Sequence, residues 1–399
     1  MVTLRHRLLL GLTLASTALL VAAACGPSLF DGLTGGDAGH GPTTGEACDR
    51  ALAPAAPTSE DTTEIPEIYF AFDEIKVDTL AAVDGGIAPA RGYDLDGLCT
   101  ACSPDAGNLP TPPSCVVARS AATTGGPTAQ CDQSNGRDNN LGAMFNTIIG
   151  FVPGAKSDFA TEKIRAGLFT ILVDVKGWNG KNDDPSVSVT IYGSLGLEPT
   201  SSVPAFDGTD TWSLDPASLV EGDSKIGLDC RLDASSCTPV GDRVAQAGNA
   251  YVSGGTLVAK FAAAPLNIDT NVGSLLFDLD APQLVAKIGK DDTGRYRLQG
   301  ELVGRWPVDK ALHAIGSLVF PDVTGKIAPL CTSSIYYGPV KIVVCSEPDL
   351  PTQVDGGSGE PCGAISSAIA FKASDEARPS FVYQRDAGSG LCATDTCAP

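Results

Sequence analysis

Two acidic stretches supply oxygen ligands of the kind that Ca²⁺ prefers. Asp94-x-Asp96-Gly97 has the acidic spacing and the turn glycine found at the start of calcium loops, although the twelve-residue pattern with its final Glu is incomplete. Further along the chain, more carboxylate and amide oxygens follow at Asp132, Asn135, Asp138 and Asn140. We therefore predict that these six residues form a Ca²⁺ site. The alternative is that they only form turns, in which Asp, Asn and Gly are common.

A second group of oxygen ligands lies in a polar loop between two segments with strand character. It comprises Asn179, Asn182, Asp183 and Asp184. Turns use the same residue types for hydrogen bonds to their own backbone. We expect turn formation to be their role, with a second Ca²⁺ site as the alternative.

Cys99 and Cys102 have the CxxC spacing that occurs both in zinc sites and in disulfide-bonded proteins. No second close CxxC and no neighbouring histidine completes a tetrahedral zinc site. We therefore expect these thiols to be oxidised to disulfides.

Histidine-dependent catalysis has little basis in this sequence. His6 and His40 lie near the start of the chain, and only His313 falls in the part predicted to fold. The motifs G-x-S-x-G, H-E-x-x-H and the P-loop are all missing from the sequence. We predict that His313, close to Lys310, is a surface residue and not a catalytic base.

Hydrolysis by a pair of carboxylates remains open, because it needs no histidine. A glycosidase uses two Asp or Glu side chains that flank a sugar bond, and 47 acidic residues make such pairs available. Trp178, Trp212 and Trp306 are the tryptophans that could stack on sugar rings. For all three we expect packing in the core or at its rim.

The first residues have the pattern of an export signal. Arg5, His6 and Arg7 give positive charge, and the uncharged run over 8–24 ends in small residues. This run is short for a membrane span and is followed at once by Gly26-Pro27, which favours a removed signal over a retained helix. We therefore predict a signal peptide over residues 1–24.

The end of this signal resembles the lipobox of bacterial lipoproteins. The match consists of Ala23, Ala24 and Cys25, whereas Ala22 stands where that class usually has Leu. The resemblance implies cleavage before Cys25, acyl chains such as palmitate on this residue, and a permanent membrane anchor. It also implies the outer membrane, because Gly26 and not Asp follows the cysteine. Ordinary signal peptidase, which would leave Cys25 unmodified, is the alternative.

The other twelve of the thirteen cysteines form an even number and can all pair outside the cytoplasm. Because close neighbours in sequence can close a hairpin or a loop, we predict the disulfides Cys230–Cys237 and Cys331–Cys345. Cys392 and Cys397 are expected to secure the C-terminal tail. Each disulfide contributes roughly 2–4 kcal/mol.

The charge of the chain argues against nucleic-acid binding. The net charge is −20 at pH 7, and removing Arg5 and Arg7 with the signal makes it −22. Such a surface repels DNA, RNA and anionic lipid, and suits an extracytoplasmic protein that stays soluble or binds cations. A hydrophobic content of 43% allows a real core, in one large or two ordinary domains.

The segments that must position these residues are mainly strands. Residues 25–63 indicate a flexible tether, and 64–399 indicate a folded region that contains a cysteine-framed, loop-rich segment over 91–140. Strands are predicted at 67–77, 168–175, 186–192, 209–214, 224–230, 250–261, 274–279, 283–288, 295–303 and 340–345. Helices are predicted at 141–152, 159–165, 308–318 and 361–371. Short strands joined by Gly-, Asp- and Asn-containing turns predict a mainly β fold, as an antiparallel β-sandwich or jelly-roll.

As a whole, the chain resembles the cysteine-rich surface lipoproteins that are abundant in myxobacteria. The residues that carry this resemblance are the Cys25 box and the stretches 94–97, 136–140 and 361–366. The resemblance implies no known activity. We expect a lipid-anchored protein of the outer membrane or cell surface that acts as a non-enzymatic binding or structural module, with a glycan or an envelope protein as partner. A carboxylate-dependent glycan hydrolase is the alternative.

Overall fold

The computed structural model describes residues 49–58, 63–77, 91–103, 109–111, 113–116, 131–133, 135–151, 158–198, 202–215, 246–270, 273–321, 326–332, 335–357, 359–376, 379, 381–382, 392 and 395–397. The predicted signal peptide, Cys25 and most of the predicted tether lie outside these residues. The predicted strand at 224–230 and the predicted pair Cys230–Cys237 also lie outside them.

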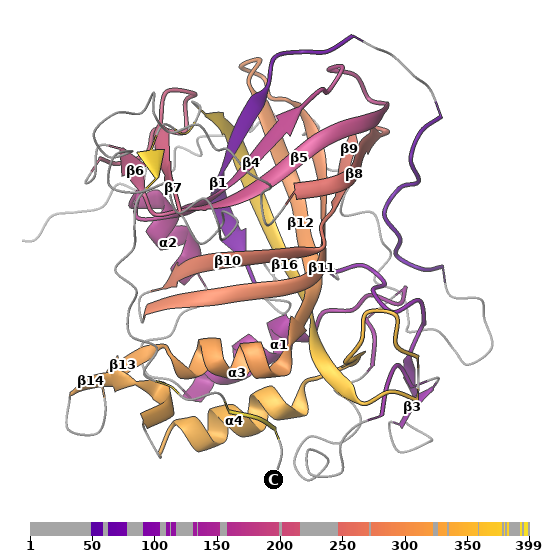
Figure 1. Cartoon of the computed structure of the whole chain (residues 1–399), viewed down its shortest axis with the longest axis vertical. Coiled ribbons are helices and arrows are strands. Elements are labelled where there is room, and N and C mark those ends of the chain that lie inside the picture. Colours follow the sequence, from indigo (N-terminus) through magenta and orange to yellow (C-terminus); the bar gives the residue numbers. More distant parts are fainter. Residues whose placement is uncertain are drawn as a thin grey trace, which may run out of the picture.

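Eight strands form an antiparallel sheet that closes on itself (Figure 1). These strands are β1 (Ile68–Lys76), β4 (Thr170–Lys176), β5 (Asp184–Ser194), β8 (Gln246–Ser253), β9 (Thr256–Lys260), β11 (Gly273–Lys290), β12 (Tyr296–Pro307) and β16 (Cys362–Glu376). They follow one another in that order, and β1 pairs with β16 as well as with β4, which closes the ring. The prediction of a mainly β, antiparallel body is confirmed.

Two further strands extend this sheet, and three small sheets lie beside it. β10 (Ala263–Thr270) forms a hairpin with the first half of β11, and β15 (Leu350–Pro351) pairs with the start of β16. The small sheets comprise β2 (Ala101–Ser103) with β3 (Leu109–Thr111), β13 (Val319–Pro321) with β14 (Ile327–Pro329), and β6 (Leu197–Glu198) with β7 (Thr211–Leu214) and β17 (Phe381–Val382).

The structure describes four short α-helices, of which three gather at one end of the molecule and α2 packs against β1 and β10. They are α1 (Asn140–Phe151), α2 (Phe159–Arg165), α3 (Val308–Gly316) and α4 (Tyr337–Ser346), and a 3₁₀ turn, η8 (Leu330–Thr332), precedes α4. Below the β10–β11 hairpin in Figure 1 lie α1, α3 and α4. In the described part of the chain, no helix has the length and apolar character needed to cross a membrane.

The interior of the closed sheet is filled by alternate side chains of its strands, because successive strand residues point to opposite faces. Phe70 and Phe72 of β1 are fully buried, and the ring of Phe72 stacks on Phe371 of β16 with 4.0 Å between centroids. The same apolar cluster continues through the β10–β11 hairpin into the helices. A separate cluster on the outer face places Trp212 of β7 against Leu172 and Tyr192.

The predicted helix at 361–371 is wrong, because these residues form β16. Its residues from 364 to 369 are all buried, so apolar side chains face both the interior and the outer layer and the period-2 signal is lost. The predicted strand at 340–345 is also wrong, since it lies within α4. In both cases a short apolar run fits either structure.

Two predicted strand boundaries also need correction. The predicted strand at 250–261 is a hairpin of β8 and β9, turning at Gly254 and Gly255, which both have positive φ. The predicted strands at 274–279 and 283–288 are one long strand, β11, with an irregularity near Ala281, where φ is 46°. The predicted hairpin of 168–175 with 186–192 is confirmed as β4 and β5.

Within the part of the chain that the structure describes, three disulfides between identified partners join segments that are distant in sequence. Cys115 bonds Cys362 across 247 residues and fastens the cysteine-framed segment to the start of β16. The predicted pair Cys331–Cys345 is wrong, because the structure contains Cys331–Cys392 and Cys345–Cys397. The C-terminal residues return beside η8 and α4, so the cysteines nearest in space are not those nearest in sequence. The expectation that Cys392 and Cys397 secure the tail is confirmed.

We predict that Gly300→Ala destabilises the fold by at least about 2 kcal/mol through overpacking. Gly300 lies in β12, where an added Cβ would be 2.1 Å from Val285 O and 2.4 Å from Ala286 Cα. As a control, Gly150→Ala in α1 adds a Cβ with no atom within 4 Å and should stabilise the helix by roughly 0.5–1 kcal/mol. Urea unfolding of both variants measures the difference, and equal midpoints would contradict the packing described for β12.

Candidate functional site

Three of the six predicted Ca²⁺ ligands lie together in the cysteine-framed segment. Asp94, Asp96 and Asp138 each offer one carboxylate oxygen, and these oxygens lie within 4.8 Å of one another. Oxygens bonded to one Ca²⁺ at about 2.3–2.6 Å are at most about 5 Å apart, so this spacing suits a shared ion. We call these three residues, together with the neighbouring Asp132, the acidic centre.

A tight turn places the first two carboxylates. Asp94 Oδ1 accepts a hydrogen bond of 2.6 Å from the backbone N–H of Gly97, and Asp96 Oδ1 accepts one of 2.8 Å from Leu98. Gly97 has a φ of 84°, a conformation that glycine adopts without strain. Both aspartates therefore have turn-forming roles, while Asp94 Oδ2 accepts a hydrogen bond from Arg50 Nε and Asp96 Oδ2 has no hydrogen-bond partner among the described residues.

The third carboxylate reaches this turn from a different part of the segment. Asp138 Oδ2 accepts a hydrogen bond of 2.6 Å from the N–H of Leu95, and the backbone of Asp138 pairs with Tyr93. The two chains approach closely because Gly92 has no side chain: a Cβ there would be 2.4 Å from the Asp138 carbonyl oxygen. The site thus depends on contacts between residues about 40 positions apart in sequence. The sequence includes Asp138 among the predicted ligands only because of its residue type.

The remaining three predicted ligands have different roles. Asp132 Oδ2 accepts a hydrogen bond of 2.6 Å from Thr100 N–H, and its charge interacts with Asp96 and Asp138. Asn135 adopts a left-handed turn with a φ of 63°. Asn140 begins α1, and its amide nitrogen donates to the Glu347 carbonyl at 3.0 Å. For Asn135 and Asn140 the structure shows turn and helix-start roles.

The carboxyls of the acidic centre are desolvated and repel one another. Burial raises the pKa of Asp96. Burial, with the nearby charge of Asp96, raises the pKa of Asp132 to about 8. Burial and the charge of Asp132 hold the pKa of Asp138 well above its ordinary value. A proton or a cation must therefore compensate these groups at neutral pH.

The donor set fits a hard divalent ion. All the candidate ligand atoms are carboxylate oxygens, which suit Ca²⁺ or Mg²⁺ better than zinc. Asp96 Oδ2 is buried and has no hydrogen-bond partner among the described residues. Arg50 forms an ion pair with Asp94, so one of the four charges is already compensated. Three carboxyls remain for an ion or for protons.

A second group of buried charges adjoins the acidic centre. Burial raises the pKa of Asp349 to about 7 and that of Glu347 to about 7. Asp349 accepts a hydrogen bond of 2.7 Å from the N–H of Ser366. Arg305, which is 3% exposed, interacts electrostatically with Asp349, Asp138 and Asp96. This cation limits the negative potential behind the acidic centre.

The second predicted ligand group serves the hairpin between β4 and β5. Asp184 Oδ2 accepts a hydrogen bond of 2.7 Å from Asn179 N–H, and the Asn179 amide donates to the Asp183 carbonyl at 2.9 Å. Asp183 Oδ1 accepts from Gly254 N–H at 2.9 Å, and the Asn182 carbonyl accepts from Gly255 N–H at 2.7 Å. The structure thus shows the expected turn role.

Cys99 is not available as a ligand for the alternative zinc site at Cys99 and Cys102. Cys99 is disulfide-bonded, so it has no thiolate to bind a metal. Cys131, at the other end of the loop-rich segment, is also disulfide-bonded. The expectation of a disulfide at Cys99 is confirmed.

The three tryptophans are packing residues. Trp212 and Trp306 are fully buried, and Trp178 is 3% exposed with its Nε1 donating to the Lys181 carbonyl at 3.0 Å. No tryptophan therefore presents an open face for a sugar ring. His313 is half-buried, which is less exposed than predicted, and its Nδ1 has no hydrogen-bond partner in the described residues.

A pocket of about 310 Å³ lies at the rim of the closed sheet, where β1 begins and β16 ends. Its polar wall consists of Glu67, Tyr69, Tyr296, Asp375 and Glu376, and we call it the rim pocket. The register of the sheet explains this assembly, since Tyr69 of β1 stands opposite Glu376 of β16. Residues about 300 positions apart in sequence thus meet in one site.

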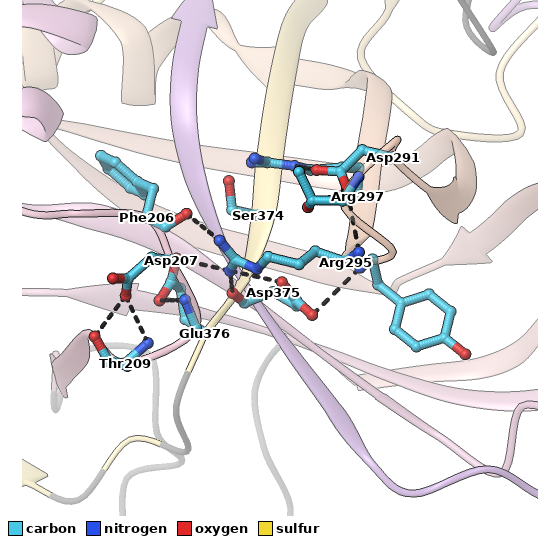
Figure 2. Close-up of polar contacts among 12 residues, drawn as sticks. Phe206, Asp207, Thr209, Asp291, Arg295, Arg297, Ser374, Asp375 and Glu376 are labelled. Atoms are coloured by element: carbon cyan, nitrogen blue, oxygen red, sulfur yellow. Dashed lines mark hydrogen bonds and ion pairs between the residues drawn. The ribbon is translucent and has the colours of Figure 1, made fainter.

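Arg295 organises the side of the rim pocket shown in Figure 2. Its Nη2 donates to Asp375 Oδ1 at 2.7 Å, and its Nη1 donates to the Phe206 carbonyl at 2.5 Å. Phe206 has a φ of 50°, which is uncommon for a residue with a side chain, so these contacts hold a strained loop in place. The nearby Arg297 forms separate ion pairs with Asp291 and Asp73.

Glu376 has one carboxyl oxygen in use and one without a partner. Its Oε2 accepts hydrogen bonds from Gly208 N–H at 3.1 Å and Asp210 N–H at 3.3 Å. Its Oε1 has no hydrogen-bond partner in the described residues, and Arg295 Nη2 is 3.8 Å away. Burial, with the charge of Asp210, raises the pKa of Glu376 to about 8. At neutral pH this carboxyl therefore carries a proton.

The sequence did not indicate the rim pocket. The sequence predicts a helix that ends at 371, before Asp375 and Glu376, and so does not place these two residues at the end of a strand. The one local signal for a strand end here is the acidic pair Asp375-Glu376, which comes soon after the alternating apolar residues Phe371 and Ala373. Its meaning depends on the pairing of β16 with β1, which no local pattern reveals.

The raised pKa values predict that stability falls with increasing pH. Folded-state pKa values near 8 for Asp132 and near 7 for Asp349 mean that the folded chain binds more protons than the unfolded chain above about pH 4. The stabilisation from these groups is complete below pH 4 and is lost as pH rises through 7 to 8. In EDTA, we expect Tm to fall by at least about 5 °C between pH 6 and pH 9.

Asp132→Asn is the matched variant for this prediction, because its amide resembles the protonated acid. Its Tm should depend less on pH over the same interval. A variant profile as steep as that of the wild type would contradict the assignment to the acidic centre.

Comparison of the chain with models of known protein families, with curated proteins and with solved structures found no match. Site geometry and residue chemistry are therefore the basis for inferring the function of this chain.

Proposed function

We propose that the chain is a lipid-anchored cell-envelope protein that acts outside the cytoplasm as a non-enzymatic binding or structural module. The observation that supports this proposal most is the set of long-range disulfides, which span 247, 61 and 52 residues. Bonds of this kind persist in oxidising compartments. They agree with the export signal and with acylation of Cys25, and the strong negative charge makes nucleic acid an unsuitable partner.

Within this proposal, the acidic centre binds Ca²⁺ and braces the cysteine-framed segment. Among the described residues of this segment, Cys115 is the one buried apolar side chain, and the segment contacts the sheet through the Cys115–Cys362 bond and the backbone pairing of Val116 with Pro361. An ion shared by Asp94, Asp96 and Asp138 would cross-link the turn at 94–97 to the start of α1. Such an ion would have a structural role, like that of a further disulfide.

A carboxylate-dependent glycan hydrolase is the second candidate, and the rim pocket is the observation that favours it. Glu376 is protonated near neutral pH, and Asp375 and Glu67 line the same pocket. Glycosidases pair a protonated carboxyl with an ionised one. Release of reducing sugar from cell-wall or capsular polysaccharide, abolished by Glu376→Gln, would establish this candidate. Binding of glycan without release would support the module.

We predict that Ca²⁺ raises Tm at pH 7.5, by an amount that corresponds to about 2.7 kcal/mol when its concentration is 100 times Kd. Asp96→Asn and Asp138→Asn should abolish this increase and the heat of binding in calorimetry. In EDTA both variants should be at least as stable as the wild type, because a neutral amide avoids the cost of a buried carboxyl that must either ionise or bind a proton. Asp292→Asn, in an exposed turn, is the control and should respond like the wild type. A variant that keeps the full Ca²⁺ response would exclude its residue as a ligand.

We predict that the intact protein purified from the membrane fraction of its host carries acyl chains on Cys25 and no free thiol. Mass spectrometry with and without alkylation measures both properties. Cys25→Ala should release the protein to the soluble fraction without changing the number of free thiols. A native chain without acyl mass and with many reduced thiols would contradict the proposal.

A further inference from the structure

We propose that the rim pocket binds a neutral sugar residue, and so is the place where this module holds a glycan. This inference rests on the binding part of the proposed function. It follows from four properties of the pocket: compensated charges, a buried carboxyl with one unpartnered oxygen, an apolar wall beside polar groups, and a small volume.

The carboxylates of the pocket are already compensated by cations of the protein. Glu67 forms an ion pair with Lys176, which also lies 3.1 Å from Asp174 Oδ2. Asp375 is paired with Arg295 at 2.7 Å. Glu67 and Asp174 share the charge of Lys176, so each ionised carboxylate of the pocket already has a cationic neighbour and a cationic ligand would compete with it. Their oxygens remain acceptors for hydroxyl groups.

Glu376 contributes a neutral group to the floor of the pocket. The residue is 8% exposed and its side chain is fully buried, with Oε1 unpartnered in the described residues. Since the carboxyl is protonated at neutral pH, it can donate where the neighbouring carboxylates can only accept. A ligand oxygen at the floor would provide the acceptor that this buried donor lacks.

Hydroxyl groups are the ligand groups that suit such a mixture. A hydroxyl both donates and accepts, so neighbouring hydroxyls on one ring can use ionised carboxylates and a protonated carboxyl together. A ligand with a carboxylate or phosphate would meet Glu67 and Asp375 with like charge. A polyamine would find both of these groups already paired with Lys176 and Arg295. A neutral polyhydroxylated ring avoids both difficulties.

The other walls of the pocket fit the apolar face of a sugar ring. Ile65, Pro66 and Ile68 line it beside Tyr296. The Tyr296 ring is held in place, with Trp178 edge-on at 5.5 Å and the Lys290 ammonium 4.6 Å from the ring centroid. A volume of about 310 Å³ lies at the small end of ligand pockets. The pocket therefore suits one sugar residue at a time, with the rest of a glycan outside.

The test measures binding of glucose, galactose, mannose and N-acetylglucosamine to the full chain by saturation-transfer NMR and calorimetry. Single sugars bind weakly, so concentrations up to about 100 mM are needed. We expect at least one of them to bind the wild type. Glu67→Gln keeps the size and one acceptor oxygen but removes the charge, and Tyr296→Leu removes the aromatic wall. Each should weaken binding at least about tenfold.

Asp355→Asn is the matched control, because Asp355 is exposed and lies before the first residue of β16, whereas Glu376 is the last residue of that strand. It should bind sugar like the wild type. Melting curves show whether each variant is folded. If Tyr296→Leu does not fold, the result for Glu67→Gln decides the test. Spermidine and tetramethylammonium serve as cationic probes in the same assay.

Three results would overturn the inference: no sugar binds the wild type, both variants bind as well as the control, or a cationic probe binds more tightly than every sugar. These results are separate from a failure of the proposed function. A chain with acyl mass and Ca²⁺ binding but no sugar binding contradicts only the assignment of the rim pocket. A chain without acyl mass that still binds sugar contradicts only the anchor.

Discussion

The pairing of β1 with both β4 and β16 is the contact on which the rest of the molecule depends. It closes the sheet, and it brings Phe72 onto Phe371 in the interior with 4.0 Å between ring centroids. The end of β16 then meets the start of β1, which forms the rim pocket. The start of β16 receives the cysteine-framed segment through Cys115–Cys362. One strand thus connects both candidate sites.

The two candidate sites face the same electrostatic problem and differ in how it is solved. A buried carboxyl is unfavourable when ionised, unless a proton, a cation or hydrogen-bond donors stabilise it. At the rim, Glu376 accepts two backbone N–H bonds and retains its proton. In the acidic centre, Arg50 forms a direct ion pair with Asp94 alone among the four aspartates. For that reason the acidic centre suits a divalent ion, whereas the rim pocket suits a neutral ligand.

Local chemistry was visible in the sequence, and long-range pairing was not. The β4–β5 hairpin could be predicted because its residues alternate, and Asp94 and Asp96 because their spacing with Gly97 specifies a turn. Asp138 was included by residue type alone, since its approach to the turn depends on tertiary contacts. The strand β16 was misread because it is apolar on both faces, a consequence of its place between the interior and the outer layer.

The same limit applies to the cysteines and to the rim pocket. The choice of Cys331–Cys345 assumed that sequence neighbours pair, whereas the tail brings Cys392 and Cys397 to them. The rim pocket draws on residues near 67, 208, 296 and 375, and no pattern within one segment connects these positions. Local sequence patterns do not reveal that β1 pairs with β16, which is the contact that closes the sheet.

Closure also has a consequence for the order in which the chain can mature. The last residue of β1 and the last residue of β16 are Lys76 and Glu376, so one edge of β1 stays open until nearly the whole polypeptide has emerged. Until then, the exposed edge can recruit strands from other chains. The nascent protein is therefore most vulnerable to aggregation at its beginning, and oxidation of Cys115 before Cys362 arrives would trap the wrong partner.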